Sequence, residues 1–563
     1  MINELQEDLA KLCRDLYKIE VKPSVEMSDG QFGDYASNVA LQLAGRLGKN
    51  PRDIAQELSD KLNGGDYKKI HTAMPAGPGF INITLTQEAL WTIVEAEPAK
   101  PLAGQTIVAE YSDPNPFKVL HAAHLYTSIM GDAVANLLEN AGAKVHRVNF
   151  GGDVGLHVGK TMWAIVGHCS DGELNEGRAL SEIQRLAEQE LSARIAFITK
   201  RYVEGNNAYE TDEKAKQQII DYNKRVYQVH ELDDHESPFA QIYWNCREWS
   251  YQYFDEFYRF IGSRFEKYYP ESQTAPLGVK TVQEHIGDVY EESNGAIVFP
   301  GEKYGLHTRV FINSQGLPTY EAKDVGLIMA KWNDYKFDRS VVITGNDIIE
   351  YMKVVLKSIE QFAPDLSRRT THVTHGIVKL SGGVKMSSRL GNILGATDVI
   401  QFAAAANREL TGKDDEQVTL GAVKYAFLKQ RMGGDIIYDP AESVSIEGNS
   451  GPYLQYAHAR AKSILSKADK QPAKSLDLDV PERSLLRKIG EYQEVVAKAT
   501  EELMPHHVCT YLYELAQEFN SFYEKSRIID DPREEVRLKL VELYSQTLKG
   551  GLNLLGIEAP ERM

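Results

Sequence analysis

Two short segments, far apart in the chain, carry side chains that can bind a polyphosphate. The first is HAAH, in which His121 and His124 are three residues apart. It follows a predicted buried strand and opens a predicted helix, so both imidazoles lie on one face of the first turn. Imidazole N–H groups, and the backbone N–H groups that are unpaired at a helix N-terminus, favour anions. Histidines also cap helices and pack in cores, so HAAH alone is weak evidence.

The second segment is VKLSGGVKMSSRLGN, a glycine-containing loop that presents Lys385, Ser387 and Ser388. One ammonium and two hydroxyls on such a loop can clamp pyrophosphate as it leaves. An ordinary basic surface loop has the same composition, so this segment alone decides nothing either.

The elements around HAAH are predicted to form a βαβ unit. TIVAEYS is a predicted buried strand, a helix is expected to begin near Leu120 and to stop at Gly142, and KVHRVNF is the next strand. Strand-like runs return at GAIVFP, TRVFIN and RSVVITG between helical patterns. We therefore expect the same α/β sheet to resume there.

A chain of 563 residues is too long for one ordinary core, and three domains are predicted. Residues 1–99 show helices followed by one short strand in GPGFINITL, and Pro98 and Pro101 mark the boundary. Residues 100–412 contain the α/β sheet, interrupted at 170–262 by a charged helical insertion. Residues 413–563 show no convincing strand and are predicted to form a helical bundle.

The composition, with 42% apolar and 25% charged residues, is that of a soluble globular protein. Because the N-terminus lacks the apolar run of a signal peptide or membrane span, we expect a cytosolic protein without a membrane partner. The four cysteines are scattered singly, which argues against zinc and against a disulfide framework. A net charge of -17 does not suggest bulk adhesion to nucleic acid, so any RNA contact must use local basic surfaces.

HAAH after the first sheet strand and KMSS after the last one resemble the paired signatures of class I aminoacyl-tRNA synthetases. The resemblance is closest to the arginyl-tRNA synthetases and extends along nearly the whole chain. The segments that carry it are FGDYASNVALQLA, AGPGFINI, SDPNPFKVLHAAH, WNCREWSYQYFDEFY, GNSGPYLQYAHAR and GLNLLGIEAPERM.

This resemblance implies a nucleotide-binding (Rossmann-like) α/β catalytic domain, an N-terminal α+β domain that touches the tRNA elbow and an all-α C-terminal domain that binds the anticodon. It implies that ATP, with Mg²⁺, and L-arginine form arginyl-adenylate, and that the arginyl group passes to the 3′ end of tRNA(Arg). It also implies that bound tRNA is needed for activation. We expect a monomer.

The resemblance also assigns roles to individual residues. The catalytic set that it implies is His121, His124, Lys118, Lys385, Ser387 and Ser388. The arginine-binding set that it implies is Glu110, Asp113, Asn115, His124, Tyr320 and Asp324. The guanidinium of arginine has five N–H donors and a positive charge, so its binding site needs carboxylates and planar hydrogen-bond acceptors. At four-residue spacing, the last two side chains lie on one helix face and can converge on a guanidinium.

Three positions depart from the family pattern. Where the family usually has glutamine this chain has Ile348, with Asn346 or Asp347 as possible substitutes. Val154 and His157 replace the usual tryptophan and glutamine in GGDVGLHVGK, so a pocket wall is expected to differ. KMSSR has serine where many class I enzymes have a second lysine, and Lys118 can supply that charge.

Candidate RNA contacts lie at both ends of the chain. Tyr456 and Arg460 on a predicted amphipathic helix can stack on or hydrogen-bond anticodon bases. Tyr35, Asn38 and Phe80 are candidates for the tRNA elbow. For each aromatic residue, simple packing in the domain core is an equally good interpretation.

Three other functions compete with this interpretation. A non-catalytic tRNA-binding relative would keep the fold but lose the adenylate site, against which the intact His121, His124 and Lys385 argue. A small-molecule nucleotidyltransferase with an H-x-x-H site would need no long helical C-terminal domain. A class I synthetase for lysine or cysteine is the nearer alternative, although the cysteine enzyme usually binds zinc.

Overall fold

A parallel sheet forms the centre of the molecule. The computed structural model describes residues 1–381 and 394–563. Within these residues the sheet has the order β12, β11, β5, β6, β7, with every neighbouring pair parallel. Its strands are β5 (Thr106–Glu110), β6 (Lys144–Gly151), β7 (Lys267–Pro270), β11 (Arg339–Gly345) and β12 (Thr370–His375). The order reverses between β5 and β11, and at such a switch point a crevice opens at the carboxyl ends of the strands.

The predicted βαβ unit is present. TIVAEYS and KVHRVNF form β5 and β6, and α5 (Ala122–Asn140) joins them. This helix begins two residues after the predicted start at Leu120, and Gly142 follows its end with a positive φ of 96°. Its apolar face is buried against the sheet and the helical domain, which fixes the helix N-terminus at the crevice.

The expectation that GAIVFP and TRVFIN continue the central sheet is wrong. They form β9 (Ala296–Phe299) and β10 (Arg309–Ile312), which pair with β8 (Glu291–Ser293) in a separate antiparallel sheet. Alternating apolar residues mark a strand but do not specify its partner, and the short turn at Asn294 and Gly295 favours hairpin pairing of β8 with β9. Only RSVVITG returns to the central sheet, as β11.

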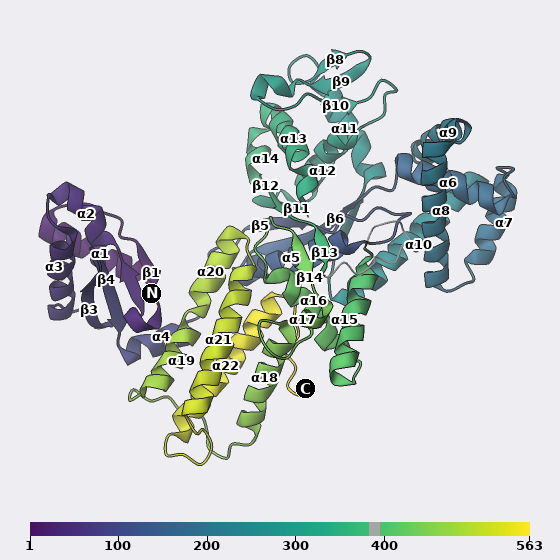
Figure 1. The fold of residues 1–563 in the computed structure, drawn as a ribbon. Helices are drawn as coiled ribbons and strands as arrows, with labels where there is room; N and C mark the ends of the chain where they lie inside the picture. Colours follow the sequence, from purple (N-terminus) through teal and green to yellow (C-terminus); the bar gives the residue numbers. More distant parts are fainter. Residues whose placement is uncertain (382–393) are drawn as a thin grey trace.

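Helices cover the central sheet and extend from it. The helices between β7 and β12 are α11 (Glu271–Glu284), α12 (Tyr320–Tyr335), α13 (Ile349–Phe362) and α14 (Pro364–Arg369), with the short 3-10 turns η2 (Gly301–Tyr304) and η3 (Asn346–Ile348). The helices between β6 and β7 are α6 (Leu156–Cys169), α7 (Glu176–Leu186), α8 (Leu191–Thr211), α9 (Glu213–Glu231) and α10 (Pro238–Ile261). Of these, α6 to α10 project to one side with a core of their own (Figure 1).

The N-terminal region is an α+β unit with more strands than the sequence pattern indicates. Its elements are α1 (Ile2–Tyr17), β1 (Val25–Met27), η1 (Gly30–Phe32), β2 (Tyr35–Ser37), α2 (Val39–Leu47), α3 (Pro51–Gly64), β3 (Ile70–Ala76), β4 (Phe80–Leu85) and α4 (Gln87–Glu95). The strand predicted in GPGFINITL is β4, at an inner position of an antiparallel sheet of order β1, β2, β4, β3. The strands β1 and β2 are too short to show alternation, so the pattern missed them.

The C-terminal region is helical apart from one short strand. Its helices are α15 (Ala396–Thr411), α16 (Glu416–Leu428), α17 (Pro440–Ser443), α18 (Gly451–Ser466), α19 (Val480–Gly490), α20 (Tyr492–Glu502), α21 (His506–Lys525) and α22 (Glu534–Leu554). The expectation of no strand after Asp415 is wrong at β14 (Ile436–Tyr438), which pairs in parallel with β13 (Val378–Leu380). The three residues of β14 are too few to show the alternation of apolar and polar side chains that marks a strand. Their strand conformation depends on pairing with β13, which is distant in the sequence.

The N-terminal region docks on the helical region through buried charge. The carboxylate of Asp34 accepts from Arg483 at 2.7 Å and lies 3.3 Å from Arg487, both on α19. The indole of Trp91 on α4 donates to the carbonyl of Ser475 at 2.8 Å. Figure 1 shows α4 beside α19, so these contacts hold the first 95 residues against the helices.

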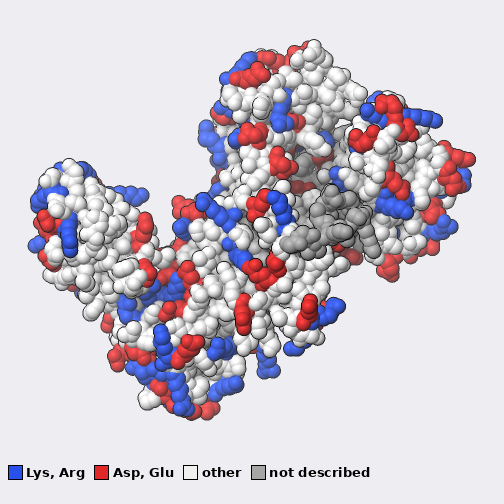
Figure 2. Space-filling view, viewed as in Figure 1, with Lys and Arg blue, Asp and Glu red and all other residues white. Residues whose placement is uncertain are grey.

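The visible surface carries charges of both signs. Figure 2 shows acidic and basic side chains interspersed rather than separated into large fields. Among the residues that the structure describes, no helix is both long enough and apolar enough to span a membrane.

Candidate active site

A cavity of about 670 Å³ lies at the switch point of the central sheet. We call it the sheet-edge cavity. Residues that follow the carboxyl ends of β5 and β11, the first turn of α5 and one face each of α12 and α13 line it. Parallel strands bring their carboxyl ends to one edge, so segments far apart in sequence meet there.

All six residues of the predicted arginine-binding set line this cavity. They are Glu110, Asp113, Asn115, His124, Tyr320 and Asp324. His121 also lines it, whereas Lys118 does not. Asp347 adds a further carboxylate and Arg309 a guanidinium to the walls. Acidic groups therefore outnumber basic ones in the described lining.

The two histidines of HAAH face each other at the start of α5. Their rings stack with centroids 3.7 Å apart, and the backbone N–H of His121 donates to Nδ1 of His124 at 3.1 Å. Because Nδ1 of His124 accepts, the proton of the neutral ring is on Nε2. The ring of His124 thus has one N–H donor left for another partner.

Burial keeps both imidazoles neutral. It lowers the pKa of His121 to about 4, helped by the nearby Lys118 ammonium. It lowers the pKa of His124 well below the usual value, and His121 and Lys118 act in the same direction. At neutral pH the pair can donate hydrogen bonds but adds no positive charge.

The expectation that HAAH lies beside unpaired backbone N–H groups is wrong in part. The N–H of His121 is taken by His124, and the N–H of Ala122 donates to the carbonyl of Leu394 at 2.8 Å. The amide of Ala396 donates to the carbonyl of Leu120 at 3.0 Å, so this later segment pairs with the helix start. Much of the anion-binding capacity of this helix end is therefore used internally.

The loop after β5 holds its polar side chains in a strained turn. Ser112 and Asp113 have positive φ values of 75° and 49°. The carboxylate of Asp113 accepts from the amide of Phe150 at 2.8 Å, and Asn115 Oδ1 accepts from the amide of Gly152 at 2.8 Å. Both side chains are thereby fixed to the end of β6. Non-glycine residues persist in such a backbone only where contacts hold them, often at functional sites.

Glu110 already has a counter-charge inside the protein. Lys331 on α12 is fully buried and donates to Glu110 and, at 3.2 Å, to the hydroxyl of Ser340. Removing either partner of such a buried pair would leave the other without a counter-charge. The pair leaves one carboxylate oxygen of Glu110 for the cavity.

Asp324 and Tyr320 lie one turn apart on α12, as the spacing predicts. Tyr320 is 64% exposed at the mouth of the cavity. Asp324 accepts a hydrogen bond from the hydroxyl of Tyr351 on α13. Burial raises the pKa of Asp324 to about 7, and Tyr351 opposes that shift.

Comparison with known proteins places the chain in a family. A family model described as tRNA synthetases class I (R), catalytic domain, matches residues 87–439, which is more than half of the chain. Models of the arginyl tRNA synthetase N terminal domain and of the DALR anticodon binding domain match residues 1–85 and 454–563. The chain belongs to the class I arginyl-tRNA synthetases.

Individual relatives agree with this assignment over most of their length. The chain is 28% identical to an arginine–tRNA ligase of Bdellovibrio bacteriovorus, covering 98% of this chain and 95% of that protein. It is 27% identical to an arginine–tRNA ligase of Phocaeicola vulgatus, covering 92% and 91%. The solved arginyl-tRNA synthetase of Thermus thermophilus has the same fold, with a TM-score of 0.80, 24% identity and full coverage of both chains.

The departures from the arginyl-tRNA synthetase pattern fall at different distances from the cavity. Ile348 and Asp347 line it, whereas the amide of Asn346 donates to the carbonyl of Gly433 at 2.8 Å. Val154 is buried in the core of the helical insertion. His157 is bonded to the carbonyl of Gly152 at 2.8 Å, and neither of these two lines the cavity.

Of the predicted ATP site, Lys118 lies outside the described lining of the cavity, and the loop residues are not described. The Lys118 ammonium stands 5.0 Å from the ring centre of Tyr202 on α8, in contact with the insertion. Lys385, Ser387 and Ser388 fall in 382–393, outside the described residues. Two described residues on either side of that range contact α5: His375 bonds Thr127 at 2.6 Å, and the carbonyl of Leu394 accepts from the amide of Ala122 at 2.8 Å.

Some lining residues escaped the sequence interpretation. They are Thr127, Arg309, Tyr351 and His375. For Thr127, Arg309 and His375, which belong to unremarkable helix or strand patterns, nothing in the local sequence distinguishes a lining residue from a core or surface residue. The position of Tyr351, one turn after Ile348, was the available signal.

The predicted RNA contacts differ in accessibility. Tyr35 is only 4% exposed, and its hydroxyl donates to Glu494 on α20 at 3.2 Å. It therefore packs between β2 and α20, which fits the alternative that this side chain supports the domain core. Asn38 accepts from Gln42 at 2.9 Å near the surface, and Phe80 is 38% exposed.

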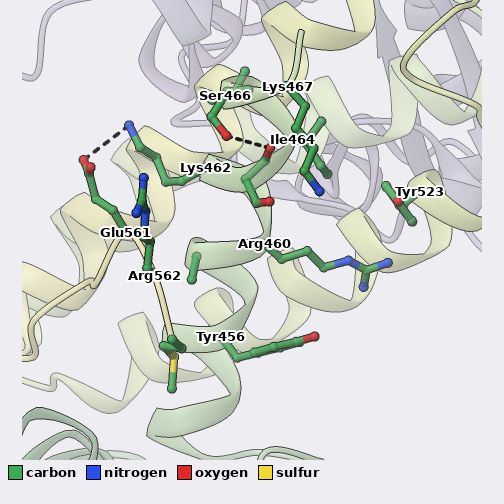
Figure 3. Close-up of a pocket in the computed structure, with 13 residues that line it drawn as sticks. Tyr456, Arg460, Lys462, Ile464, Ser466, Lys467, Tyr523, Glu561 and Arg562 are labelled. Atoms are coloured by element: carbon green, nitrogen blue, oxygen red, sulfur yellow. Dashed lines mark hydrogen bonds and ion pairs between the residues drawn. The ribbon is translucent and has the colours of Figure 1, made fainter.

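Tyr456 and Arg460 line a second cavity, of about 900 Å³, which we call the helical-domain cavity. Its walls come from α18, from Tyr523 on α21 and from the last three residues of the chain. Figure 3 shows Tyr456 and Arg460 extending to the same side of α18. The Arg460 guanidinium lies 4.2 Å from the ring centre of Tyr523, and Lys462 is 3.5 Å from Glu561.

No group of three or more His, Cys, Asp or Glu in the described ranges is arranged to hold a metal ion. The four cysteines are free thiols, and three of them are buried.

Proposed function

We propose that the sheet-edge cavity activates L-arginine with ATP and that the arginyl group is then transferred to the 3′ end of tRNA(Arg). The observation that carries the proposal is the union, in one cavity, of the neutral histidine pair with an excess of carboxylates. The histidines suit a triphosphate and the carboxylates suit a cationic side chain, so the two substrates have separate complementary walls.

Arginine recognition rests on groups that are already oriented. Asp324 offers one carboxylate oxygen beside Tyr351, and Tyr320 stands one turn away at the cavity mouth. Asp113 and Asn115 are fixed by backbone bonds near β6 and suit the α-amino and carboxyl groups of an amino acid. Preorganised acceptors lose little conformational freedom when a substrate binds.

The ATP side of the site combines described and undescribed residues. His124 can donate from Nε2 to a phosphate oxygen, because its Nδ1 is occupied. His121 stacks on it and can donate to the same group. We assign Lys385, Ser387 and Ser388 to the leaving pyrophosphate on the family pattern, and Lys118 to the surrounding positive field.

Class I synthetases use ATP, and we propose that Mg²⁺ accompanies it. Mg²⁺ usually binds through substrate phosphates, one or two carboxylates and water rather than in an all-protein cage. When bound it would neutralise triphosphate charge. Among the described lining residues, Asp347 lies just after the end of β11, and its carboxylate suits binding of the Mg²⁺ that accompanies ATP.

For tRNA we propose that the helical-domain cavity receives unpaired anticodon bases. Tyr456 is 47% exposed and offers a stacking face, while Arg460 and Lys462 supply local positive charge. Asn38 and Phe80 remain the candidates for the elbow. The boundaries at residues 99 and 412, the monomeric state and the cytosolic location stay predictions from the sequence.

The decisive experiment is ATP–pyrophosphate exchange with each amino acid, with and without tRNA. We expect exchange with arginine that depends on tRNA. Exchange with lysine or cysteine instead would contradict the arginine assignment. Absence of exchange under every condition, with tRNA still bound, would favour the non-catalytic relative.

A further inference from the structure

Tyr351 on α13 and Asp324 on α12 meet at the wall of the sheet-edge cavity, and both line it. The hydroxyl of Tyr351 donates to Oδ2 of Asp324. Throughout the described chain, no other side chain forms a hydrogen bond with this carboxylate. The orientation of Asp324 therefore depends on a single partner from a different helix.

The surroundings of Asp324 make its charge depend on that partner. Burial raises its pKa to about 7, and the carboxylates of Glu110 and Glu271 also raise it. The Tyr351 hydroxyl and the Lys331 ammonium oppose them. The charged and titratable groups around the pair are Glu110 on β5, Asp113 after β5, Glu271 on α11, Glu321 and Lys331 on α12, and Arg309 on β10.

We propose that Tyr351 is a positioning residue that holds Asp324 ionised and aimed at a guanidinium, and that it thereby sets the preference for a cationic over a neutral amino-acid side chain. The inference rests on the proposed activation of arginine. It adds which residues of the cavity wall make the site prefer a cationic side chain.

Geometry separates Tyr351 from the rest of α13. Ile348, the last residue of η3 before α13, lines the same cavity, but its side chain has no polar atom with which to bind either Asp324 or a substrate. Tyr351 is the polar side chain that this helix directs to Asp324. Its O–H donates to Oδ2, so Oδ1 and the second lone pair of Oδ2 are left to accept from a guanidinium.

Removal of the Tyr351 hydroxyl should change the pKa of Asp324 in a predictable direction. A hydrogen bond to the charged form of a carboxyl lowers its pKa, so loss of that bond raises the pKa of Asp324. Near neutral pH a larger fraction is then protonated and cannot pair with a cation. The acid limb of kcat/KM for arginine therefore moves to higher pH, because that limb reports the free enzyme.

The test uses Tyr351→Phe in the full chain, with tRNA present. Aminoacylation gives kcat and KM for arginine across neutral pH, and inhibition by L-citrulline gives the affinity for a side chain in which a neutral urea replaces the guanidinium. We expect the arginine KM to rise about tenfold, as for loss of a hydrogen bond to a charged group. We expect kcat and the citrulline inhibition constant to change little.

Tyr290→Phe is the matched control. Tyr290 is buried, and its hydroxyl bonds Ser358 on the same helix α13 at 3.2 Å, away from the cavity lining. It should leave the arginine KM and the pH profile unchanged. Equal loss of arginine and citrulline binding in Tyr351→Phe would indicate general damage to the wall and would overturn the proposal.

A double-mutant cycle with Asp324→Asn completes the test. If Tyr351 acts through Asp324, Tyr351→Phe should have almost no further effect on the arginine KM in the Asp324→Asn background. Full additivity of the two changes would contradict the inference. Failure of the unmodified chain to activate arginine would defeat the proposed function itself, which is a separate outcome.

Discussion

The sheet-edge cavity and the helical-domain cavity hold their polar side chains in different ways. In the first, Glu110 is paired with the buried Lys331, and Asp113 is bonded to the backbone of β6. In the second, Tyr456 is 47% exposed, and Lys462 reaches Glu561 across the surface. The first set is fixed before any ligand arrives, whereas the second can still adjust.

This difference has an energetic consequence. Breaking a buried ion pair leaves an uncompensated charge in a low dielectric, whereas exposed pairs contribute little. Fixed acceptors reduce the ordering cost of binding a small, flexible substrate, while unpaired RNA bases can be met by exposed aromatic and cationic groups. Substitutions should therefore have large, localised effects at the sheet edge and smaller effects in the helical domain.

The largest effect is expected at the buried pair. Lys331→Met removes the partner of Glu110 and should destabilise the fold by about 3–5 kcal/mol, as for other broken buried pairs. Urea unfolding, with the midpoint and slope measured together, checks this. Adding Glu110→Gln should recover much of the stability without restoring arginine activation. Unchanged stability in the single variant would show that the pair is not buried in solution.

Lys385→Ala tests the side of the site that lies outside the described residues. Loss of one charge that stabilises the transition state should slow charging about 100-fold or more, with little change in stability. Single-turnover formation of the adenylate is the measurement. Replacement of Lys379, an exposed lysine paired with Asp435, is the control. Normal charging by Lys385→Ala would contradict the assigned role.

Asp324→Asn should lower kcat/KM for arginine roughly 10- to 100-fold through KM, because a charge-assisted hydrogen bond is lost. The pH profile offers a second readout. In the unmodified chain kcat/KM should fall below about pH 7 as Asp324 is protonated, since its pKa is raised to about 7. The variant should lack this limb. An equal change in the KM for ATP would indicate a general defect.

The smallest effect is expected in the helical-domain cavity. Tyr456→Ala should raise the KM for tRNA about tenfold if one base stacks on the ring, and the arginine KM should not change. Tyr523→Phe, which keeps the ring of a neighbouring wall residue, is the control. Loss of arginine activation in Tyr456→Ala would mean that the two cavities are not independent.

The sequence predicted the parts of the fold that depend on local pattern. Buried runs of apolar residues located β5, β6 and β11, and a helical period located α5. Prediction from the sequence failed where strand pairing decides the structure. The strands β9 and β10 joined a separate sheet, and β14 was too short to recognise. Strand alternation is a property of one segment, but the partner of a strand is a property of the whole fold.

The site divides in the same way. Family motifs and spacing predicted a shared site for His121, His124 and Asp324, and all three line the sheet-edge cavity. Only the tertiary structure brought Tyr351 to Asp324, paired Lys331 with Glu110 and buried Tyr35 between domains. These contacts join residues distant in the chain, and burial, which sets their charge and accessibility, exists only after the domains pack.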